Sequence, residues 1–261
     1  MFDPWQDALR PMERIGRLIE AHESIGSTND RARALLDGGA ADGVVVVAEQ
    51  QTAGRGRRGR TWLSPPGVNL MLSICLQPRL AASDAWQLGL ASALAVMAAA
   101  RTDAPVWLKW PNDVVADDGR KIAGLLVETM ADGDRLTGAI VGIGINVNWA
   151  RAAMPAEIAA GATSLAELAG EPIDRVRLLA GLLAAFEVEL SRIEAGDSPI
   201  DRYRAACTTL GSRVTVRTAD AEIVGEATGL DATGSLVVEA TSGRHTLASG
   251  EVVRVERAVP A

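Results

Sequence analysis

The chain contains few residues of the kinds that build metal centres, disulfide frameworks or catalytic triads. Two cysteines, Cys75 and Cys207, and two histidines, His22 and His245, are present among its 261 residues. Neither pair shows the spacing of metal ligands, and the isolated histidines give little support to a Ser-His-Asp hydrolase. We therefore expect reduced structural thiols and no metal site built from protein ligands.

Long apolar runs are also absent. The longest, residues 88–100, is shorter than the roughly 18 residues that a membrane-spanning helix needs. The first residues, which include Asp3, Asp7 and Arg10, lack the apolar core of a signal peptide. We therefore expect a cytoplasmic protein without a membrane segment.

Net positive charge is missing as well. The 26 Lys and Arg residues are outnumbered by 33 Asp and Glu residues, which gives a formal net charge of −7. This sign argues against a protein that binds nucleic acid with its whole surface, although a local basic patch stays possible. The 48% apolar and 23% charged residues are typical of a globular chain long enough for one large core and a small appended domain.

The pattern along the chain predicts an α+β fold with a mixed or antiparallel central sheet flanked by helices. Ser27 is expected to cap a helix over 28–37 with its hydroxyl, followed by Gly38 and Gly39 as a left-handed stop. Further helices are expected over 83–101 and over 175–194, the second capped by Asp174. Strands are expected over 44–48, 68–76, 106–109, 113–116, 121–130 and 136–147, joined mostly by antiparallel turns.

After Thr208 the sequence changes to short strands separated by glycines. They are expected over 213–217, 222–228, 235–240 and 251–255. This spacing indicates a small β-barrel. We therefore predict two domains, a catalytic domain over 1–208 and a C-terminal domain over 209–261.

The segment from Gly54 to Arg60 concentrates four arginines among three glycines, and no acidic residue occurs between Gln50 and Ser83. Arginine binds phosphate or carboxylate through paired hydrogen bonds, and glycine lets the backbone approach a ligand. The composition fits an anion-binding loop, a solvated flexible loop or an RNA contact equally well.

Three further motifs favour an anion-binding site. Lys109-Trp110-Pro111-Asn112-Asp113 crowds a lysine, an amide and a carboxylate at a strand end, and Lys121 opens a strand in which Gly124 would allow a ligand close to the backbone. The segment 142–148 carries two glycines and two asparagines, a pattern too polar for core packing alone. Neither a dinucleotide fingerprint nor a Walker A motif is present, so ATP, if used, binds in another way.

Taken in order, five motifs resemble those of biotin protein ligases. They are Ser27-Thr28-Asn29, the run from Gln51 to Trp62, Lys109 to Asp113, Lys121 to Glu128, and Gly142 to Asn146. The similarity covers residues 20–257 and implies a class II synthetase-like biotin/lipoate ligase fold with an SH3-like C-terminal barrel. It implies activation of biotin by ATP as biotinyl-5'-AMP and transfer to one lysine of a biotin carboxyl carrier domain. Mg²⁺ would be carried mainly by the ATP phosphates.

The resemblance also implies a role for each motif residue. The implied biotin-binding residues are Ser27, Thr28, Asn29, Gln51, Gly54, Arg55, Gly56, Arg57, Lys121 and Gly124. The implied ATP-binding residues are Arg58, Arg60, Trp62, Asn112, Asp113, Lys121 and Asn146. Lys121 and Arg57 are the implied catalytic residues, because cationic groups offset the repulsion between a carboxylate and a phosphate.

Two alternatives remain at this point. A lipoate-protein ligase shares the fold and the adenylation chemistry, although the arginine loop favours biotin. A nucleic-acid-binding module would use the arginine loop alone. Only 26 residues precede Ser27, too few for the winged helix-turn-helix of relatives that repress transcription, so we expect no nucleic-acid partner. The resemblance implies a monomer or a homodimer.

Overall fold

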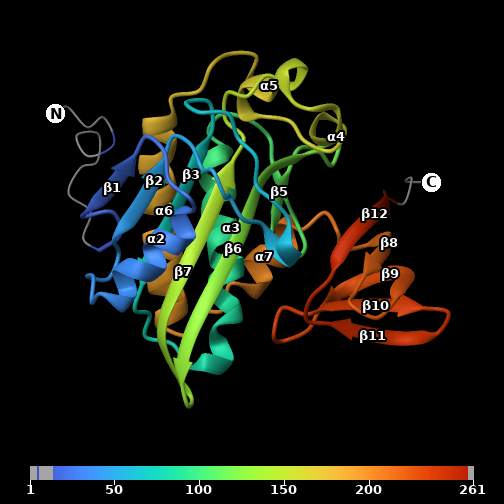
Figure 1. The fold of residues 1–261 in the computed structure, drawn as a ribbon. Helices are drawn as coiled ribbons and strands as arrows, with labels where there is room; N and C mark the ends of the chain where they lie inside the picture. The colour runs from blue at the N-terminus through green and yellow to red at the C-terminus, as the bar shows by residue number, and fades with distance from the viewer. Residues whose placement is uncertain (1–4, 6–13, 258–261) are drawn as a thin grey trace.

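The computed structural model describes residues 5 and 14–257, and it contains two sheets joined by helices (Figure 1). The expectation about the first residues, that they carry no signal-peptide core, falls largely outside this described part. No helix within the described ranges is both long and apolar enough to cross a membrane.

The central sheet has seven strands in the order β1-β2-β3-β7-β6-β5-β4. Their bounds are Ile19–His22 (β1), Val45–Ala48 (β2), Leu70–Leu76 (β3), Trp107–Lys109 (β4), Asp113–Val115 (β5), Lys121–Asp132 (β6) and Arg135–Ile145 (β7). β1 pairs with β2 in parallel, and every other neighbouring pair is antiparallel. The predicted mixed, mainly antiparallel sheet is therefore confirmed.

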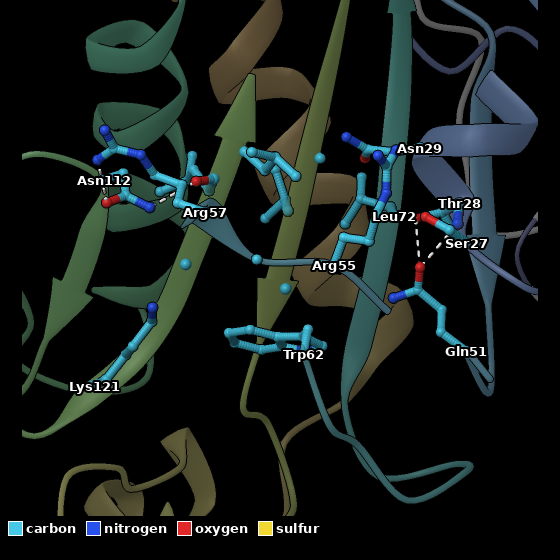
Figure 2. Close-up of a pocket in the computed structure, with 17 residues that line it drawn as sticks. Ser27, Thr28, Asn29, Gln51, Arg55, Arg57, Trp62, Leu72, Asn112 and Lys121 are labelled. Carbon is cyan, nitrogen blue, oxygen red and sulfur yellow. Dashed lines mark hydrogen bonds between the residues drawn. The ribbon is translucent and has the colours of Figure 1, made fainter. Parts of the chain in front are cut away.

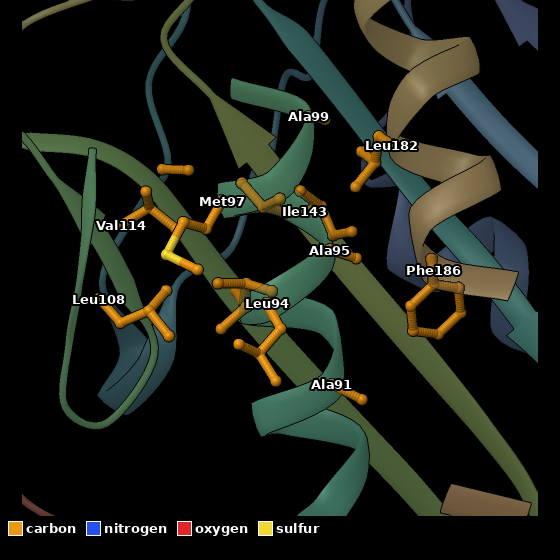
Figure 3. Packing of buried hydrophobic residues seen from close by; sticks show 14 of the residues in the cluster. Ala91, Leu94, Ala95, Met97, Ala99, Leu108, Val114, Ile143, Leu182 and Phe186 are labelled. Carbon is orange, nitrogen blue, oxygen red and sulfur yellow. The ribbon is translucent and has the colours of Figure 1, made fainter. Parts of the chain in front are cut away.

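Two long helices, α3 (Trp86–Ala100) and α6 (Arg175–Glu194), pack together against one face of this sheet. Ala91, Ala95 and Ala99 recur every four residues on α3 and face Leu182 and Phe186 of α6 (Figure 3). Small side chains at this spacing form one helix face and let the two helices approach closely. This burial between α6 and the sheet accounts for the almost uniformly apolar character of residues 88–100.

Helix α2 (Thr28–Asp37) covers the opposite face, over β2, β3 and β7. Its bounds match the prediction, but its N-terminus differs, because the Ser27 side chain makes no capping hydrogen bond. The Gln51 side-chain oxygen accepts instead from the Thr28 N–H at 2.8 Å. Gly38 has φ −82°, so the left-handed turn falls on Gly39, at φ +78°.

Strand alternation decides which residues face the functional side of the sheet. On β7, Val141, Ile143 and Ile145 point into the helical core, so Gly142 and Gly144 face the side of α2. On β6, Gly124 lies on that same face, directly paired with Gly144. Three glycines on two adjacent strands thus leave a shallow floor where larger side chains would stand.

The C-terminal part forms a separate five-stranded antiparallel sheet in the order β11-β10-β9-β8-β12. The bounds are Ser212–Arg217 (β8), Glu222–Leu230 (β9), Leu236–Ala240 (β10), Gly243–Leu247 (β11) and Glu251–Arg257 (β12). Figure 1 shows it in orange and red beside the part of the chain that holds the central sheet. This C-terminal sheet agrees with the small β-domain that the sequence predicts, with β11 added.

The remaining helices are short. They are α4 (Ala156–Ala159), α5 (Leu165–Ala169) and α7 (Ile200–Ala206), with single 3₁₀ turns at Arg57–Gly59, Ala82–Asp84 and Arg151–Ala153. The predicted start of the second helix at Ser83 was wrong, because Ala82–Asp84 forms a 3₁₀ turn and α3 begins at Trp86. Asp174 caps α6 as predicted, its side chain accepting from the N–H groups of Val176 and Arg177.

Candidate active site

A cavity lies on the glycine floor of the central sheet, between the N-terminus of α2, the arginine loop and β5–β6 (Figure 2). Residues from all five sequence motifs line it. They are Ser27, Thr28, Asn29, Gln51, Arg55, Gly56, Arg57, Trp62, Leu72, Asn112, Lys121, Gly124, Leu125, Leu126, Gly142, Ile143 and Gly144. The fold therefore brings together residues that are more than 100 positions apart in the chain.

One wall of the cavity is a buried hydrogen-bond network at the start of α2. The Ser73 hydroxyl has two hydrogen-bond acceptors close by, Thr28 Oγ1 at 2.8 Å and Asn29 Oδ1 at 2.6 Å. Thr28 Oγ1 also lies 3.2 Å from Gln51 Oε1. These contacts hold the amide and hydroxyl groups in place, so the wall offers donors and acceptors in a fixed arrangement.

Asn29 extends this network across the sheet. Its Nδ2 donates to Glu128 of β6 at 3.2 Å. Its Oδ1 lies only 2.2 Å from the position that a Cβ on Gly142 would occupy. Gly142 is therefore needed for the packing of Asn29 itself, and the protein side chain occupies the room for which the sequence pattern predicted a ligand.

Arg55 closes the cavity from the solvent side through two carboxylates. Its guanidinium forms an ion pair with Asp30 of α2 at 2.6 Å and with Glu128 of β6 at 3.4 Å. The Arg55 side chain is 42% exposed, so these ion pairs are weak and screened by solvent. Such contacts hold a loop over a cavity while still letting it open.

The arginine loop has an ordered backbone. Trp62 N donates to Gly54 O at 2.9 Å and Gly56 N donates to Arg60 O at 2.7 Å, so the loop closes on itself like a narrow hairpin. Arg58 adopts φ +58° at its tip, a left-handed conformation that costs a residue other than glycine some energy. This turn points consecutive arginines in different directions.

Arg57 points inward and meets the Lys109-to-Asp113 segment. Its Nη1 donates to Asn112 Oδ1 at 3.0 Å, and Asn112 Nδ2 donates to Leu125 O at 2.7 Å (Figure 2). Burial lowers the pKa of the Arg57 guanidinium from its usual high value, and Asp113 opposes this effect. Arg57 therefore carries a partly desolvated positive charge at the edge of the cavity.

Lys121 and Trp62 lie on the glycine floor. Lys121 Nζ forms an ion pair with Asp113 Oδ1 at 2.7 Å and lies 5.6 Å from the centre of the Trp62 ring. A Cβ on Gly124 would meet Lys121 Nζ at 2.7 Å, and one on Gly144 would meet the Trp62 ring at 2.4 Å. The Trp62 indole N–H is buried and finds no acceptor among the described residues.

A second, larger groove of about 400 Å³ continues from Lys121 toward the C-terminal sheet. Five cationic side chains line it, Arg57, Arg58, Arg60, Lys109 and Lys121, against the two carboxylates of Asp113 and Glu251. Burial lowers the pKa of the Lys109 ammonium. The carboxylate of Asp113 raises this pKa, and the positive charge of Lys121 lowers it further. The excess of positive charge suits a polyanion such as a nucleotide triphosphate.

Two of the arginines connect this groove to the C-terminal sheet. Arg60 forms an ion pair with Glu251 of β12, and its hydrogen bond holds the pKa of that carboxyl below the usual range. Arg58 Nη1 donates to the Arg217 carbonyl of β8 at 2.9 Å. The two contacts place the C-terminal sheet at the rim of the groove.

The structure brings most of the predicted site residues to one of these two spaces, with two exceptions. Gly54 lies outside both and supports the loop, because a Cβ there would meet Trp62 O at 2.4 Å. Asn146 is 4% exposed, and its side chain lies 3.5 Å both from Asn69 Nδ2 and from the Lys121 carbonyl. Its assignment to the nucleotide stays a prediction.

Sequence reasoning missed several residues that shape the site. They are Asp30, Ser73 and Glu251, while Lys109 and Glu128 stand in the quoted motifs but were given no role of their own. Ser73 gave a usable signal, because it is the one hydroxyl in the otherwise apolar strand Leu70–Leu76. Glu128 gave a weaker signal, because it is an acidic residue that follows the mostly apolar residues of β6.

Within the described residues, no group of three or more His, Cys, Asp or Glu side chains could hold a metal ion. The groove offers oxygen atoms from Asn112, Asp113 and Glu251, and both carboxylates are already paired, Asp113 with Lys121 and Glu251 with Arg60. This donor set fits an ion that arrives with phosphate oxygens and leaves few positions for the protein.

Comparison with known proteins identifies the class to which this fold and site belong. Residues 22–146 match the model of the biotin/lipoate A/B protein ligase family, and residues 209–255 match that of the biotin protein ligase C-terminal domain. The first match contains all five motifs and the second covers most of the C-terminal sheet.

Individual relatives agree. The chain is 34% identical over 244 residues to the bifunctional ligase/repressor BirA of Bacillus subtilis, covering 92% of this chain and 75% of the relative. It is 34% identical over 248 residues to the biotin–[acetyl-CoA-carboxylase] ligase of Mycobacterium tuberculosis, covering 92% and 90%. The structure of the Aquifex aeolicus biotin protein ligase in complex with biotin and ATP superimposes with a TM-score of 0.76 at 32% identity, covering 93% and 100%. The chain therefore belongs to the biotin protein ligase family.

Proposed function

We propose that this chain joins biotin to ATP as biotinyl-5'-AMP and transfers the biotinyl group to one lysine of a biotin carboxyl carrier domain. One observation supports this most strongly. A small cavity of fixed hydrogen-bonding groups, at Thr28 and Gln51, opens directly into a groove with five cationic side chains. A neutral polar ring and a polyphosphate would each find a matching environment there.

We assign the cavity on the α2 side to biotin. The ureido group needs both donors and acceptors in a partly apolar cleft, which Ser27, Thr28, Asn29 and Gln51 provide. Three residues of the arginine loop, Arg55, Gly56 and Arg57, would cover it, with Gly54 shaping the loop and Gly124 making room for Lys121.

We assign the cationic groove to ATP. Arg58, Arg60, Asn112, Asp113 and Lys121 would face the phosphates, and Asn146 is assigned to the same ligand by motif position alone. Trp62 lies between the two spaces, and the unpaired N–H of its ring together with its flat face supports a role in covering the adenine. Mg²⁺ would arrive with the phosphates and neutralise part of their charge.

The first step requires the biotin carboxylate to attack the α-phosphorus while pyrophosphate leaves. Two anions must approach, so cationic side chains at the meeting point lower the barrier by offsetting their repulsion. Lys121 and Arg57 lie where the cavity and the groove join, because both line both spaces. We therefore assign the catalytic role to this pair, and no protein nucleophile is needed.

The setting of this reaction is also a proposal. We place the boundary between a catalytic domain and a C-terminal domain at residues 208 and 209, and we place the protein in the cytoplasm, where ATP and carboxylases occur. We propose that it acts as a monomer or homodimer and without nucleic acid. The net charge of −7 supports the last point.

The test is ATP–pyrophosphate exchange measured with biotin, lipoate and octanoate in parallel. We expect exchange with biotin at a rate far above that with the other two acids. Exchange with lipoate or octanoate instead would favour the lipoate-ligase branch of the fold, which the arginine loop disfavours. The absence of exchange with every acid would contradict adenylation itself.

A further inference from the structure

The segment that follows β7 carries two asparagines that the cavity and the cationic groove do not explain. Asn146 is buried, and Asn148 lines neither space. Asn148 instead exchanges hydrogen bonds with the backbone of Ile173. Its Nδ2 donates to the Ile173 carbonyl at 2.9 Å, and its Oδ1 accepts from the Ile173 N–H at 2.8 Å. This exchange ties the end of β7 to the residues that lead into α6.

Asn69, directly before β3, holds the same segment from another side, and it is 1% exposed. Its Oδ1 accepts from the Val147 N–H at 2.9 Å, and its Nδ2 lies 3.5 Å from Asn146 Oδ1. The Asn146 N–H in turn donates to the Ile122 carbonyl at 2.8 Å, directly beside Lys121. The position of Asn69 therefore bears on the start of β6, where Lys121 lies.

Arg175, the first residue of α6, joins Asn69 to the carboxylate of Glu49. Its Nη1 donates to the Asn69 carbonyl at 3.0 Å and to Glu49 Oε2 at 2.8 Å, and its Nη2 donates to Glu49 Oε1 at 3.2 Å. The Arg175 and Glu49 side chains are 20% and 27% exposed, so the pair is partly desolvated. A planar guanidinium that binds a carboxylate with two donors fixes the relative position of its partners.

Trp5 covers this guanidinium. The centre of the Trp5 ring lies 5.2 Å from Arg175 Cζ, and Trp5 is 5% exposed. The face of an aromatic ring attracts a cation, and here it also keeps water away from it. Water therefore competes less for the donors that bind Glu49 and Asn69.

Glu49 connects this arrangement to the wall of the biotin cavity. It directly follows β2 and precedes Gln51 by two residues, and its N–H donates to the His22 carbonyl at 2.9 Å. Gln51 Oε1 accepts from the Thr28 N–H at the start of α2 (Figure 2). A displacement of Glu49 would therefore reach Gln51 through a short stretch of chain.

We propose that Arg175 is a positioning residue for adenylate formation, which holds Gln51 through Glu49 and the start of β6 through Asn69. This inference rests on the proposed function, which assigns Gln51 to biotin and Lys121 to both substrates. Arg175 itself lines neither the cavity nor the cationic groove, so it acts through these residues and not by contact with a ligand.

The test compares Arg175→Met with Arg177→Met in biotin-dependent ATP–pyrophosphate exchange. We expect Arg175→Met to raise the KM for biotin and the KM for ATP about fivefold or more each, because the groups that bind both substrates lose their alignment. Arg177, two residues further along α6, is the matched control, since its ion pair with Asp103 lies at an exposed arginine. We expect Arg177→Met to keep both KM values within about twofold of the unsubstituted protein.

Glu49→Gln separates the two connections that Arg175 makes. It keeps the size of the side chain and removes the charge that faces Arg175, while the contact between Arg175 and Asn69 remains. We expect the KM for biotin to rise about threefold or more and the KM for ATP to stay within about twofold. Thermal unfolding of each variant establishes that the assay temperature lies below its Tm, and Glu49→Gln decides the question if Arg175→Met does not fold.

The inference would be overturned by unchanged KM values in Arg175→Met or by a rise of equal size in Arg177→Met. A fall in kcat with both KM values unchanged would also overturn it, because a smaller folded fraction produces that result. An unchanged KM for biotin in Glu49→Gln would contradict the connection to Gln51. An unsubstituted protein without biotin-dependent exchange would contradict the proposed function instead, so the two failures are distinguishable.

Discussion

At the scale of single residues, three cations of the site each have a defined neighbour. Lys121 is paired with Asp113, Arg57 with Asn112, and Arg60 with Glu251. Their positions follow from the floor beneath them, because Gly124 leaves the room that the Lys121 side chain occupies. A substrate anion would replace or join these contacts without large movement of the backbone.

Lys121→Ala is expected to slow biotinyl-AMP formation about 100-fold to 1000-fold, because deleting one donor to a developing anion costs about 2.7–4 kcal/mol. Pyrophosphate release measures this rate. Arg120→Ala is the matched control, because Arg120 is the adjacent residue and pairs with Asp118, away from both ligand-binding spaces. Equal rates in Lys121→Ala and the unsubstituted protein would remove Lys121 from the mechanism.

Cys75 illustrates a residue whose inert character follows from burial. Its side chain is buried on the face under α2, and burial raises the pKa of the thiol to about 11. Since the thiolate is the reactive form, we expect no alkylation of Cys75 by iodoacetamide at pH 8 in the folded protein. Mass spectrometry of the native and the urea-unfolded protein provides the check, and rapid native labelling would show that this position opens.

Much of the site could be predicted from the sequence at this scale, since Ser27, Gln51, Arg57 and Lys121 stand in recognisable motifs and all reach the cavity. Contacts between residues that lie far apart in the sequence could not be predicted. Glu128, for example, contacts Arg55 and Asn29 only because β6 lies beside β7 in the folded sheet. A single carboxylate in a strand does not indicate which arginine it will contact in the folded protein.

At the scale of elements, the glycine floor of β6 and β7 decides where the site lies. The alternation of Gly142 and Gly144 with buried isoleucine and valine places the glycines on one face, and pairing in register sets Gly144 beside Gly124. The Trp62 ring then lies directly on the backbone at Gly144. This floor connects a sequence pattern to the geometry of the cavity.

Gly144→Ala is expected to displace the Trp62 ring, because the new Cβ would stand 2.4 Å from it. Nucleotide binding should weaken more than biotin binding, by up to the roughly 1–3 kcal/mol that base stacking on an aromatic ring contributes. Calorimetry with each ligand measures the two affinities. Gly229→Ala on β9 is the control, since a Cβ there meets nothing within 4 Å. Equal losses for both ligands would contradict the role of Trp62.

The elements that could be predicted from the sequence are those with strong periodicity or clear caps, such as α2, α6 and the strands β3, β6 and β7. The short elements could not. β1 is four residues long and has two polar positions, and α4 has four residues and no side-chain cap. Such segments are ordered by tertiary contacts, as when β1 pairs with β2 from the edge of the sheet.

At the scale of the whole molecule, segments distant in the chain are held together by a few buried polar contacts. Glu194, at the end of α6, is 4% exposed in its side chain and pairs with Arg14 at 2.6 Å while accepting from the Arg79 N–H at 2.9 Å. Burial alone raises the pKa of the Glu194 carboxyl, but the Arg14 and Arg79 contacts outweigh it and lower the pKa overall. The N-terminal segment, the end of β3 and α6 meet there.

A lowered carboxyl pKa contributes stability above the ordinary value of 4.5, and this contribution is lost as the pH falls through the lower value of the folded protein. We expect Glu194→Gln to reduce the free energy of unfolding at pH 7 by roughly 1.5–3 kcal/mol, and this difference to shrink at lower pH. Urea unfolding at several pH values measures it. The exposed Glu157 supplies the control Glu157→Gln, and a constant difference at every pH would contradict the assignment.

The small number of lysines in the chain lowers the background of one assay. Lys109 and Lys121 are its two lysines, and both line the cationic groove, so the ligase itself offers few acceptors to a released adenylate. The most direct measurement is the intact mass of a carrier fragment after incubation with this protein, biotin and MgATP. We predict the gain of one biotinyl group at one lysine, with release of AMP and pyrophosphate. A carrier of unchanged mass, with biotin and ATP both left unconsumed, would contradict the account.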